Sequence, residues 1–149
     1  MSKNNTKKFT KSRKQIIKDW VARLESGNLK QTTGTLYRKS DSGKAQYCCL
    51  GVLCKTLEDN GFDFIEKSSF GDSQIEWRTE AVLPTCVTKF MELEKSDGDL
   101  AEPITFKEVD EGDGEPYEEK LTALSELNDN AQYSFKKIAE VIKKDAKYK

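Results

Sequence analysis

Apolar residues occur in clusters along the chain, and the spacing within each cluster predicts its secondary structure. The first cluster has the helical period of an amphipathic segment and comprises Ile16, Ile17, Trp20, Val21 and Leu24. A helix is expected to begin near Ser12, because Ser12 and Gln15 have the spacing of a capping box. It is expected to end at Ser26-Gly27, which places Trp20 in the core.

The second cluster contains three of the four cysteines and also has helical spacing. Its apolar positions are Leu50, Leu53, Cys54 and Leu57, and Asn60-Gly61 supplies the stop. Gly51 lies inside this segment, where glycine costs about 1 kcal/mol relative to alanine. We therefore expect Gly51 to mark a close contact with a neighbouring element.

The whole pattern predicts a single α+β domain, with about five helices around a small antiparallel sheet. Helices are expected near 12–26, 47–60, 84–94, 120–128 and 134–146. Short strands are expected before Arg38 and at 62–65, 74–77 and 104–106. Residues 1–11 are expected to form a flexible basic arm. Residues 95–119 are expected to form an acidic loop inserted into a domain that spans 12–149.

Charge is distributed unevenly along the chain, although the net charge is small. The chain of 149 residues has a net charge of -1 and fits one hydrophobic core. Ten acids face one base, Lys107, between Asp97 and Glu119, whereas both ends of the chain are basic. No apolar run approaches the roughly 20 residues that span a bilayer, and none of signal length follows the basic N-terminus. We therefore expect a cytoplasmic protein with no membrane partner.

The cysteines are more typical of a buried packing element than of a reactive site. Cys48, Cys49 and Cys54 fall close together, Cys86 is distant, and the chain contains no histidine. A zinc site would need ligand pairs and usually histidine, while a nucleophilic cysteine would need a base. We predict burial of the thiols, and we expect no metal, no cofactor, no catalytic cysteine and no disulfide.

Two polar segments are candidates for ligand contacts, and each has a purely structural alternative. Asn128-Asp129 lies at the end of a predicted helix. The pair can bind a ligand there or simply form the stop and turn, which the bonding of such side chains to nearby backbone favours. The segment from Gln31 to Gly34, with Arg38, can hold a phosphate through backbone N–H groups and a guanidinium. It lacks P-loop spacing, and the start of a strand explains the same residues.

Two aromatic residues are candidates for stacking on a base. Tyr47 and Trp77 could supply such stacking surfaces, but both are also ordinary core residues. The basic arm has no aromatic residue among its cations except Phe9, so a nucleic-acid partner is not expected.

Several short motifs together resemble a family of small proteins from phages and prophages. The motifs are Trp20-Val21 with Leu24, then Gln31 and Gly34-Thr35-Leu36, then Tyr47-Cys48-Cys49-Leu50-Gly51-Val52-Leu53-Cys54, and finally Leu127-Asn128-Asp129 with Ser134-Phe135, Ile138-Ala139 and Ile142. The resemblance implies an origin in phage or in bacterial cytoplasm, without a defined activity. Small phage accessory proteins often counter host defence, some by sequestering nucleotide-derived signals.

The leading hypothesis is a non-enzymatic phage accessory protein that binds a small nucleotide-like host signalling ligand in the host cytoplasm. Arg38 would pair with phosphate, and Asn128 and Asp129 would hold hydroxyls or amides. The full set of expected contacts is Gln31, Thr33, Arg38, Asn128 and Asp129, with Tyr47 or Trp77 stacking on the base.

Two rival hypotheses use other groups. The first is a module that docks to a host protein through the acidic residues 97–119. The second is a hydrolase or transferase acting on a nucleotide, with Asp129 or Glu76 as a general base whose pKa is raised by burial. A homo-oligomer with sites between subunits stays open, although no coiled-coil repeat argues for one.

Overall fold

The computed structural model describes residues 9–109 and 116–149, and its first helix forms where the apolar spacing predicted it. Helix α1 spans Arg13–Ser26 and buries all five predicted apolar residues. The capping box is present, since the Gln15 N–H donates to Ser12 Oγ and the Ser12 N–H donates to Gln15 Oε1. Gly27 ends the helix in the left-handed conformation, at φ 76°.

Helix α2 spans Cys49–Asp59, and its first residue lies two positions later than expected. Tyr47 belongs to a strand instead, and the Cys48 thiol caps the helix by accepting from the Gly51 N–H at 3.4 Å. The close contact expected at Gly51 is confirmed. A Cβ atom there would lie 1.8 Å from the carbonyl oxygen of Leu36, so only glycine lets the two backbones approach this closely.

Three shorter α-helices and two 3-10 turns complete the helical part of the described residues. They are η1 (Trp77–Thr79), α3 (Thr85–Met91), α4 (Leu124–Asp129), α5 (Phe135–Lys144) and η2 (Ala146–Tyr148). Helix α5 begins after Ser134, whose side chain accepts from the Lys137 N–H. Helix α3 ends earlier than expected because Glu92 adopts the left-handed conformation, at φ 59°.

The strands of the described residues form three small sheets, where one small antiparallel sheet was expected. The first has β1 (Lys30–Gln31), β2 (Tyr37–Lys39) and β3 (Ala45–Tyr47) in the order β1-β3-β2, with β1 parallel to β3. The other two are the antiparallel pairs β4 (Ile65–Ser68) with β5 (Gly71–Gln74), and β6 (Asp99–Val109) with β7 (Pro116–Ala123). The prediction of one α+β domain is confirmed.

The strands predicted at 62–65 and 74–77 are shifted in the structure. Phe62 and Phe64 lie before β4 and pack edge to face at 5.0 Å, while Trp77 begins η1. The aromatic residues that favoured strands are used for packing, and the mostly polar residues between them form the β4–β5 hairpin.

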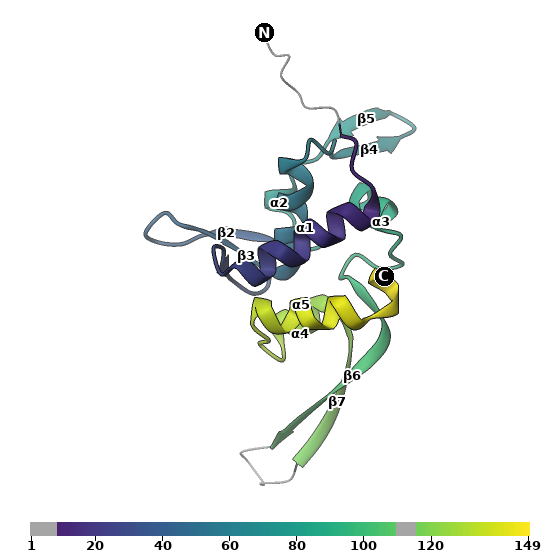
Figure 1. Ribbon diagram of the computed structural model, residues 1–149. Helices are drawn as coiled ribbons and strands as arrows, with labels where there is room; N and C mark the ends of the chain where they lie inside the picture. The colour runs from purple at the N-terminus through teal and green to yellow at the C-terminus, as the bar shows by residue number, and fades with distance from the viewer. Residues whose placement is uncertain (1–8, 110–115) are drawn as a thin grey trace.

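The largest difference from the expected fold lies in the acidic segment. Where a loop with one short strand was predicted, β6 and β7 form a long hairpin that extends away from the body (Figure 1). Ile104 pairs with Leu121 within it, and the register shifts between Asp99 and Ile104. Residues 110–115, also part of the predicted acidic loop, lie outside the described residues.

The core lies between α1, α2, α4 and α5, and Figure 1 shows α1 and α5 lying side by side. Trp20 is fully buried there, and its indole N–H donates to the Cys49 carbonyl oxygen at 2.9 Å. Among the described residues, no helix combines the length and the apolar character needed to cross a membrane.

The predicted basic arm lies mostly outside the described residues, because its positions 1–8 are not among them. Phe9 is described, and its ring contacts Phe62 and Phe90 at centroid distances of 5.3 and 5.2 Å.

Candidate functional site

Asn128 is the centre of a polar network that joins three parts of the fold. Its side chain is fully buried, and its Oδ1 accepts from Gln31 Nε2 at 2.8 Å and from the Cys49 N–H at 3.2 Å. Its Nδ2 donates to the Thr32 carbonyl oxygen and to Asp129 Oδ1, both at 2.8 Å. These four bonds use both N–H groups and both lone pairs of the amide. Asn128 therefore ties β1 and α4 to the start of α2.

The residues around Asn128 are also bonded within the protein, but some of them reach the surface. Gln31 Nε2 also donates to the Tyr133 carbonyl oxygen at 2.8 Å, so both of its N–H groups are used. Asp129 is half-buried and Thr33 is exposed beyond the end of β1. The structure thus brings Gln31, Asn128 and Asp129 together, but largely through bonds that the protein makes to itself.

The register of the first sheet separates Arg38 from that network. Arg38 lies opposite Gln46, which lies opposite Lys30, whereas Gln31 lies opposite Tyr47. Side chains that face each other across strands share one face, and successive residues alternate between faces. Arg38 therefore projects from the other face of the sheet, where it is exposed together with Lys30.

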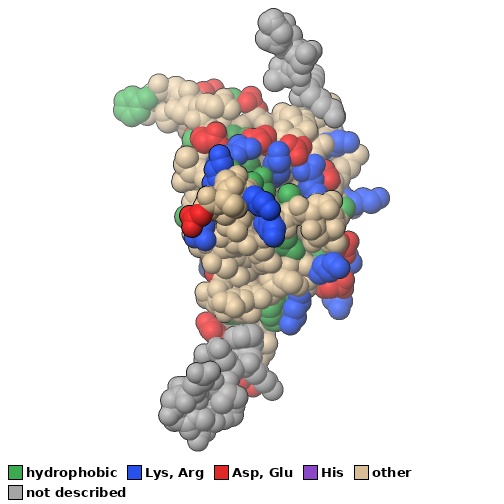
Figure 2. Space-filling view, turned by 90° about the vertical axis from the view of Figure 1, so that its left-hand side faces the viewer, with side chains coloured by type: hydrophobic (Ala, Val, Ile, Leu, Met, Phe, Trp, Pro, Cys, Tyr) green, Lys and Arg blue, Asp and Glu red, His purple; other side chains and the backbone are tan. Residues whose placement is uncertain are grey.

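Figure 2 looks onto the end of the molecule from which β2 and β3 project. It shows Lys and Arg side chains on that face, with a few acidic ones among them. Gln46 lies in the middle of the row formed with Lys30 and Arg38, and its Oε1 is buried without a hydrogen-bond partner.

The two candidate stacking residues belong to one packed aromatic cluster. The rings of Tyr47 and Trp77 stack at a centroid distance of 6.3 Å, and Tyr37 meets Tyr47 edge to face at 5.5 Å. Trp77 is 1% exposed and Tyr47 is 6% exposed. Both rings are covered by protein, so neither presents an open face to a base.

Sequence reasoning missed the ion pair that locks this cluster to α2. Arg78 donates to both carboxylate oxygens of Glu58, at 2.7 and 2.5 Å, and its guanidinium lies 4.5 Å from the Trp77 ring centroid. The hydrogen bonds from Arg78 lower the pKa of Glu58. Glu76, the second candidate base, also pairs with Arg78, at 3.3 Å. A separation of 20 residues between different elements left no local signal for the main pair.

Burial of the clustered cysteines is confirmed. Burial raises the pKa of the Cys48 thiol to about 11, and it raises the pKa values of Cys49 and Cys54 well above the ordinary value. Cys86 is half-buried, and desolvation raises the pKa of its thiol as well. All four thiols are therefore poor nucleophiles near neutral pH, because the thiolate is the reactive form.

The base of the β6–β7 hairpin is held firmly by the C-terminal residues. The Asp145 carboxylate accepts from the Ala101 N–H at 3.0 and 3.1 Å. The Tyr148 hydroxyl donates to the Asp99 carbonyl oxygen at 2.8 Å, and Lys147 forms an ion pair with the Asp99 carboxylate at 2.9 Å. The hairpin therefore has a fixed base from which its outer part extends.

The fold and these contacts define a small α+β domain with buried thiols, internally bonded amides and one long acidic hairpin. A family described as a domain of unknown function, DUF8296, matches residues 12–146, and the chain belongs to this family. No curated protein and no solved structure matches the chain.

Proposed function

We propose that this protein is a non-catalytic binding module that docks onto a positively charged surface of another protein. The contact is made by the β6–β7 arm, defined as the two strands at residues 99–109 and 116–123. The observation that carries the proposal is the shape of this arm, a two-stranded hairpin that extends from the body (Figure 1).

The physical properties of a two-stranded arm suit it to binding another protein. A two-stranded hairpin has little stability of its own, and its unpaired edges invite pairing with other chains. An arm of this kind brings open strand edges and charge to a partner without burying much of itself. Strand addition at such an edge is a recurring mode of peptide recognition.

Charge indicates the kind of partner. Residues 97–119 contain ten acids and one base, and both Glu102 and Glu118 are exposed. Complementary charge speeds association and excludes partners of the same sign. In the phage setting that the resemblance implies, the partner would be a basic host protein in the host cytoplasm.

The test shortens the arm without disturbing its base. Thr105 and Lys120 face each other in the hairpin, so an Asn-Gly turn can join them and remove 106–119. The fixed base around Asp99 and Asp145 is retained. A matched control keeps the arm and replaces exposed Lys136 of α5 with alanine.

The full chain, used as bait in a host lysate, is expected to capture one protein at a constant ratio. The shortened variant should lose that protein, and the Lys136→Ala variant should keep it. Binding should also weaken as salt rises, because exposed charges are screened. Equal capture by the shortened and full-length chains would contradict the proposal.

A second candidate is sequestration of a small, nucleotide-like anion, and the row of Lys30, Gln46 and Arg38 favours it. Two cations flank an amide whose oxygen has no partner, so an anionic ligand with a donor group would suit this face. Contact with Gln31 or Asn128 would instead require breaking their internal bonds.

Mass spectrometry of compounds released on denaturing the purified protein, followed by NMR titration with each compound, tests this candidate. Arg38→Ala should weaken binding at least tenfold, whereas Lys39→Ala, on the other face of the same strand, should not. Equal binding by both variants would remove Arg38 from the site.

A further inference from the structure

The β4–β5 hairpin carries the most exposed apolar side chain among the described residues. Phe70 is 100% exposed in the turn of this hairpin, and the next large apolar residue, Val82, is 45% exposed. The turn is ordered by Ser68, whose hydroxyl accepts from the Phe70 N–H at 3.2 Å and donates to the Gly71 carbonyl oxygen at 2.9 Å. An ordered hairpin therefore presents a phenyl ring to solvent, and aromatic rings of this kind anchor many protein contacts.

An apolar pocket lies at another part of the surface, between β6 and α5. Its volume is about 440 Å³, within the roughly 300–1,000 Å³ range of pockets that hold small molecules. Pro103, Ile104, Val141 and Ala146 supply its apolar lining, and exposed Glu102 and Lys144 line it as well. The Asp145 carboxylate bonds to the β6 backbone and keeps the two walls together.

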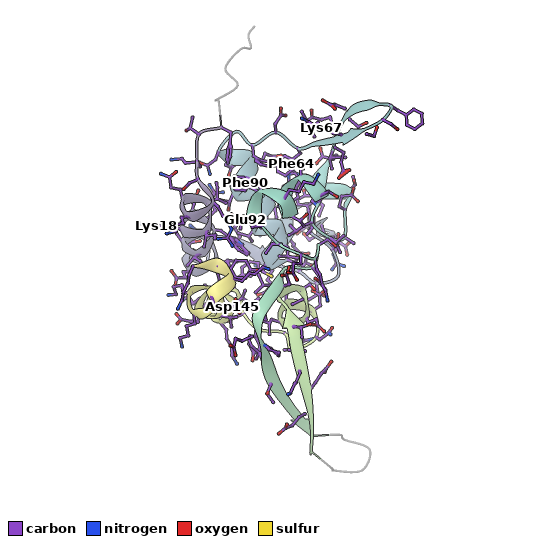
Figure 3. All side chains as sticks on the ribbon, turned by 90° about the vertical axis from the view of Figure 1, so that its right-hand side faces the viewer. Lys18, Phe64, Lys67, Phe90, Glu92 and Asp145 are labelled. Atoms are coloured by element: carbon purple, nitrogen blue, oxygen red, sulfur yellow. The ribbon has the colours of Figure 1, made fainter. Side chains whose placement is uncertain are left out.

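The two features lie far apart on one molecule. Figure 3 shows Lys67, on the β4 side of the hairpin, at one end of the body, and Asp145, beside the pocket, toward the other end. Phe70 therefore cannot enter the pocket of its own chain. The same contact between two copies meets no such obstacle.

We propose that Phe70 of one copy inserts into the β6–α5 pocket of a second copy. The contact joins different surfaces of the two copies, so each copy keeps a free Phe70 or a free pocket. Contacts of this head-to-tail type continue into chains or close into rings.

The charges beside the ring and in the pocket are complementary. Lys67 and Asp72 face each other across the hairpin next to Phe70, and Glu102 and Lys144 line the pocket. Lys67 of one copy can thus meet Glu102 of the other, and Asp72 can meet Lys144. A single aromatic anchor must offset the cost of association, so the assembly is weak and depends on concentration.

Sedimentation velocity of the full chain over a range of concentrations up to millimolar tests the contact. The average mass of the wild type should rise with concentration and pass the mass of a dimer. Phe70→Ser removes the ring, and Ala146→Glu places a charge in the pocket at an exposed position. Each variant alone should remain a monomer, while Val82→Ser, which removes the other exposed large apolar side chain of the described residues, should behave as the wild type.

Mixing the two inactive variants is the decisive experiment. Ala146→Glu retains an intact ring and Phe70→Ser retains an intact pocket, so the mixture should form a dimer and nothing larger. A wild type that stays monomeric throughout overturns the proposal, as does a mixture that stays monomeric. Binding of wild type, but not Phe70→Ser, to anionic lipid vesicles without self-association would also overturn it.

A charge exchange tests the orientation. Lys67→Glu should weaken assembly about tenfold or more, and Glu102→Lys on the pocket of the other copy should restore it in a mixture. The chain with the shortened arm retains Ile104 and the other lining residues, so it should still self-associate. Loss of partner capture and loss of self-association are therefore separate outcomes.

Discussion

Replacing Gly51 with alanine adds one methyl group, which affects the stability of the fold in two opposing ways. In an ordinary helix position the change stabilises a protein by about 1 kcal/mol, because alanine is the better helix former. Here the new Cβ atom would lie 1.8 Å from the Leu36 carbonyl oxygen, and Cβ contacts below 3.0 Å are essentially never observed. The two backbones must therefore separate by about 1.2 Å.

The cost follows from what holds Leu36 in place. Its carbonyl oxygen accepts from the Cys48 N–H at 3.3 Å, its N–H donates to the Glu80 carbonyl oxygen at 3.3 Å, and its side chain is fully buried. Losing two backbone hydrogen bonds costs about 1 kcal/mol each, and overpacking costs about 1–3 kcal/mol more. After the gain in helix propensity, we expect a net loss of about 3 kcal/mol.

Urea unfolding followed by far-ultraviolet circular dichroism measures this loss directly. The midpoint should fall with the slope unchanged, and the melting temperature should drop by about 6–12 °C for a chain of this length. Lys136→Ala, at an exposed position of α5, is the control and should change stability by less than about 0.5 kcal/mol. If Gly51→Ala is as stable as the wild type, the close approach of Leu36 does not exist and the reasoning fails.

Three further predictions concern polar and titratable groups. Asn128→Asp removes both donors of a fully buried amide, and urea unfolding should show a loss of about 3 kcal/mol. Thiol alkylation of the native protein at pH 8 should modify Cys86 first and leave Cys48, whose pKa is about 11, intact until unfolding. The hydrogen bonds from Arg78 lower the pKa of Glu58 below its ordinary value of 4.5, so the pair stabilises the fold above that pH and its contribution is lost as pH falls through the lower, folded-state pKa. In Glu58→Gln the free energy of unfolding should therefore fall less steeply with pH in this range than in the wild type. An unchanged pH dependence would show that the Arg78–Glu58 pair does not stabilise the fold.

Local patterns predicted most of the helices well, because their signals are contained in a few neighbouring residues. The helix expected at 120–128 begins only at Leu124, because the residues before it form β7. The cap at Ser12, the stop at Gly27 and the tight contact at Gly51 could all be anticipated from the sequence. The acidic hairpin could not, because its acids, glycines and prolines are typical of loops. Its base depends instead on Asp145 and Tyr148, which lie more than 40 residues from their partners in β6.

The candidate ligand residues show a second limit of sequence reasoning. The sequence indicated that Gln31 and Asn128 carry polar groups of consequence, and the structure brings them within 2.8 Å. The sequence could not indicate that these two amides hydrogen-bond to each other, or that strand alternation places Arg38 on the opposite face of the sheet. Phe70 had a weak signal, an apolar residue inside a polar turn, that only its full exposure makes meaningful.

The contacts of the last few described residues have a consequence for how the chain folds as it is synthesised. The Arg13 guanidinium donates to the Lys147 carbonyl oxygen across 134 positions of sequence, and the Tyr148 ring packs edge to face against Trp20. Contacts between such distant residues form late, because the intervening loop must first close. Until residues 135–148 have left the ribosome, α2 can cover part of the apolar face of α1, but the part that packs against α5 has no cover. During that interval the nascent chain depends on chaperones or on transient contacts of its own to avoid aggregation.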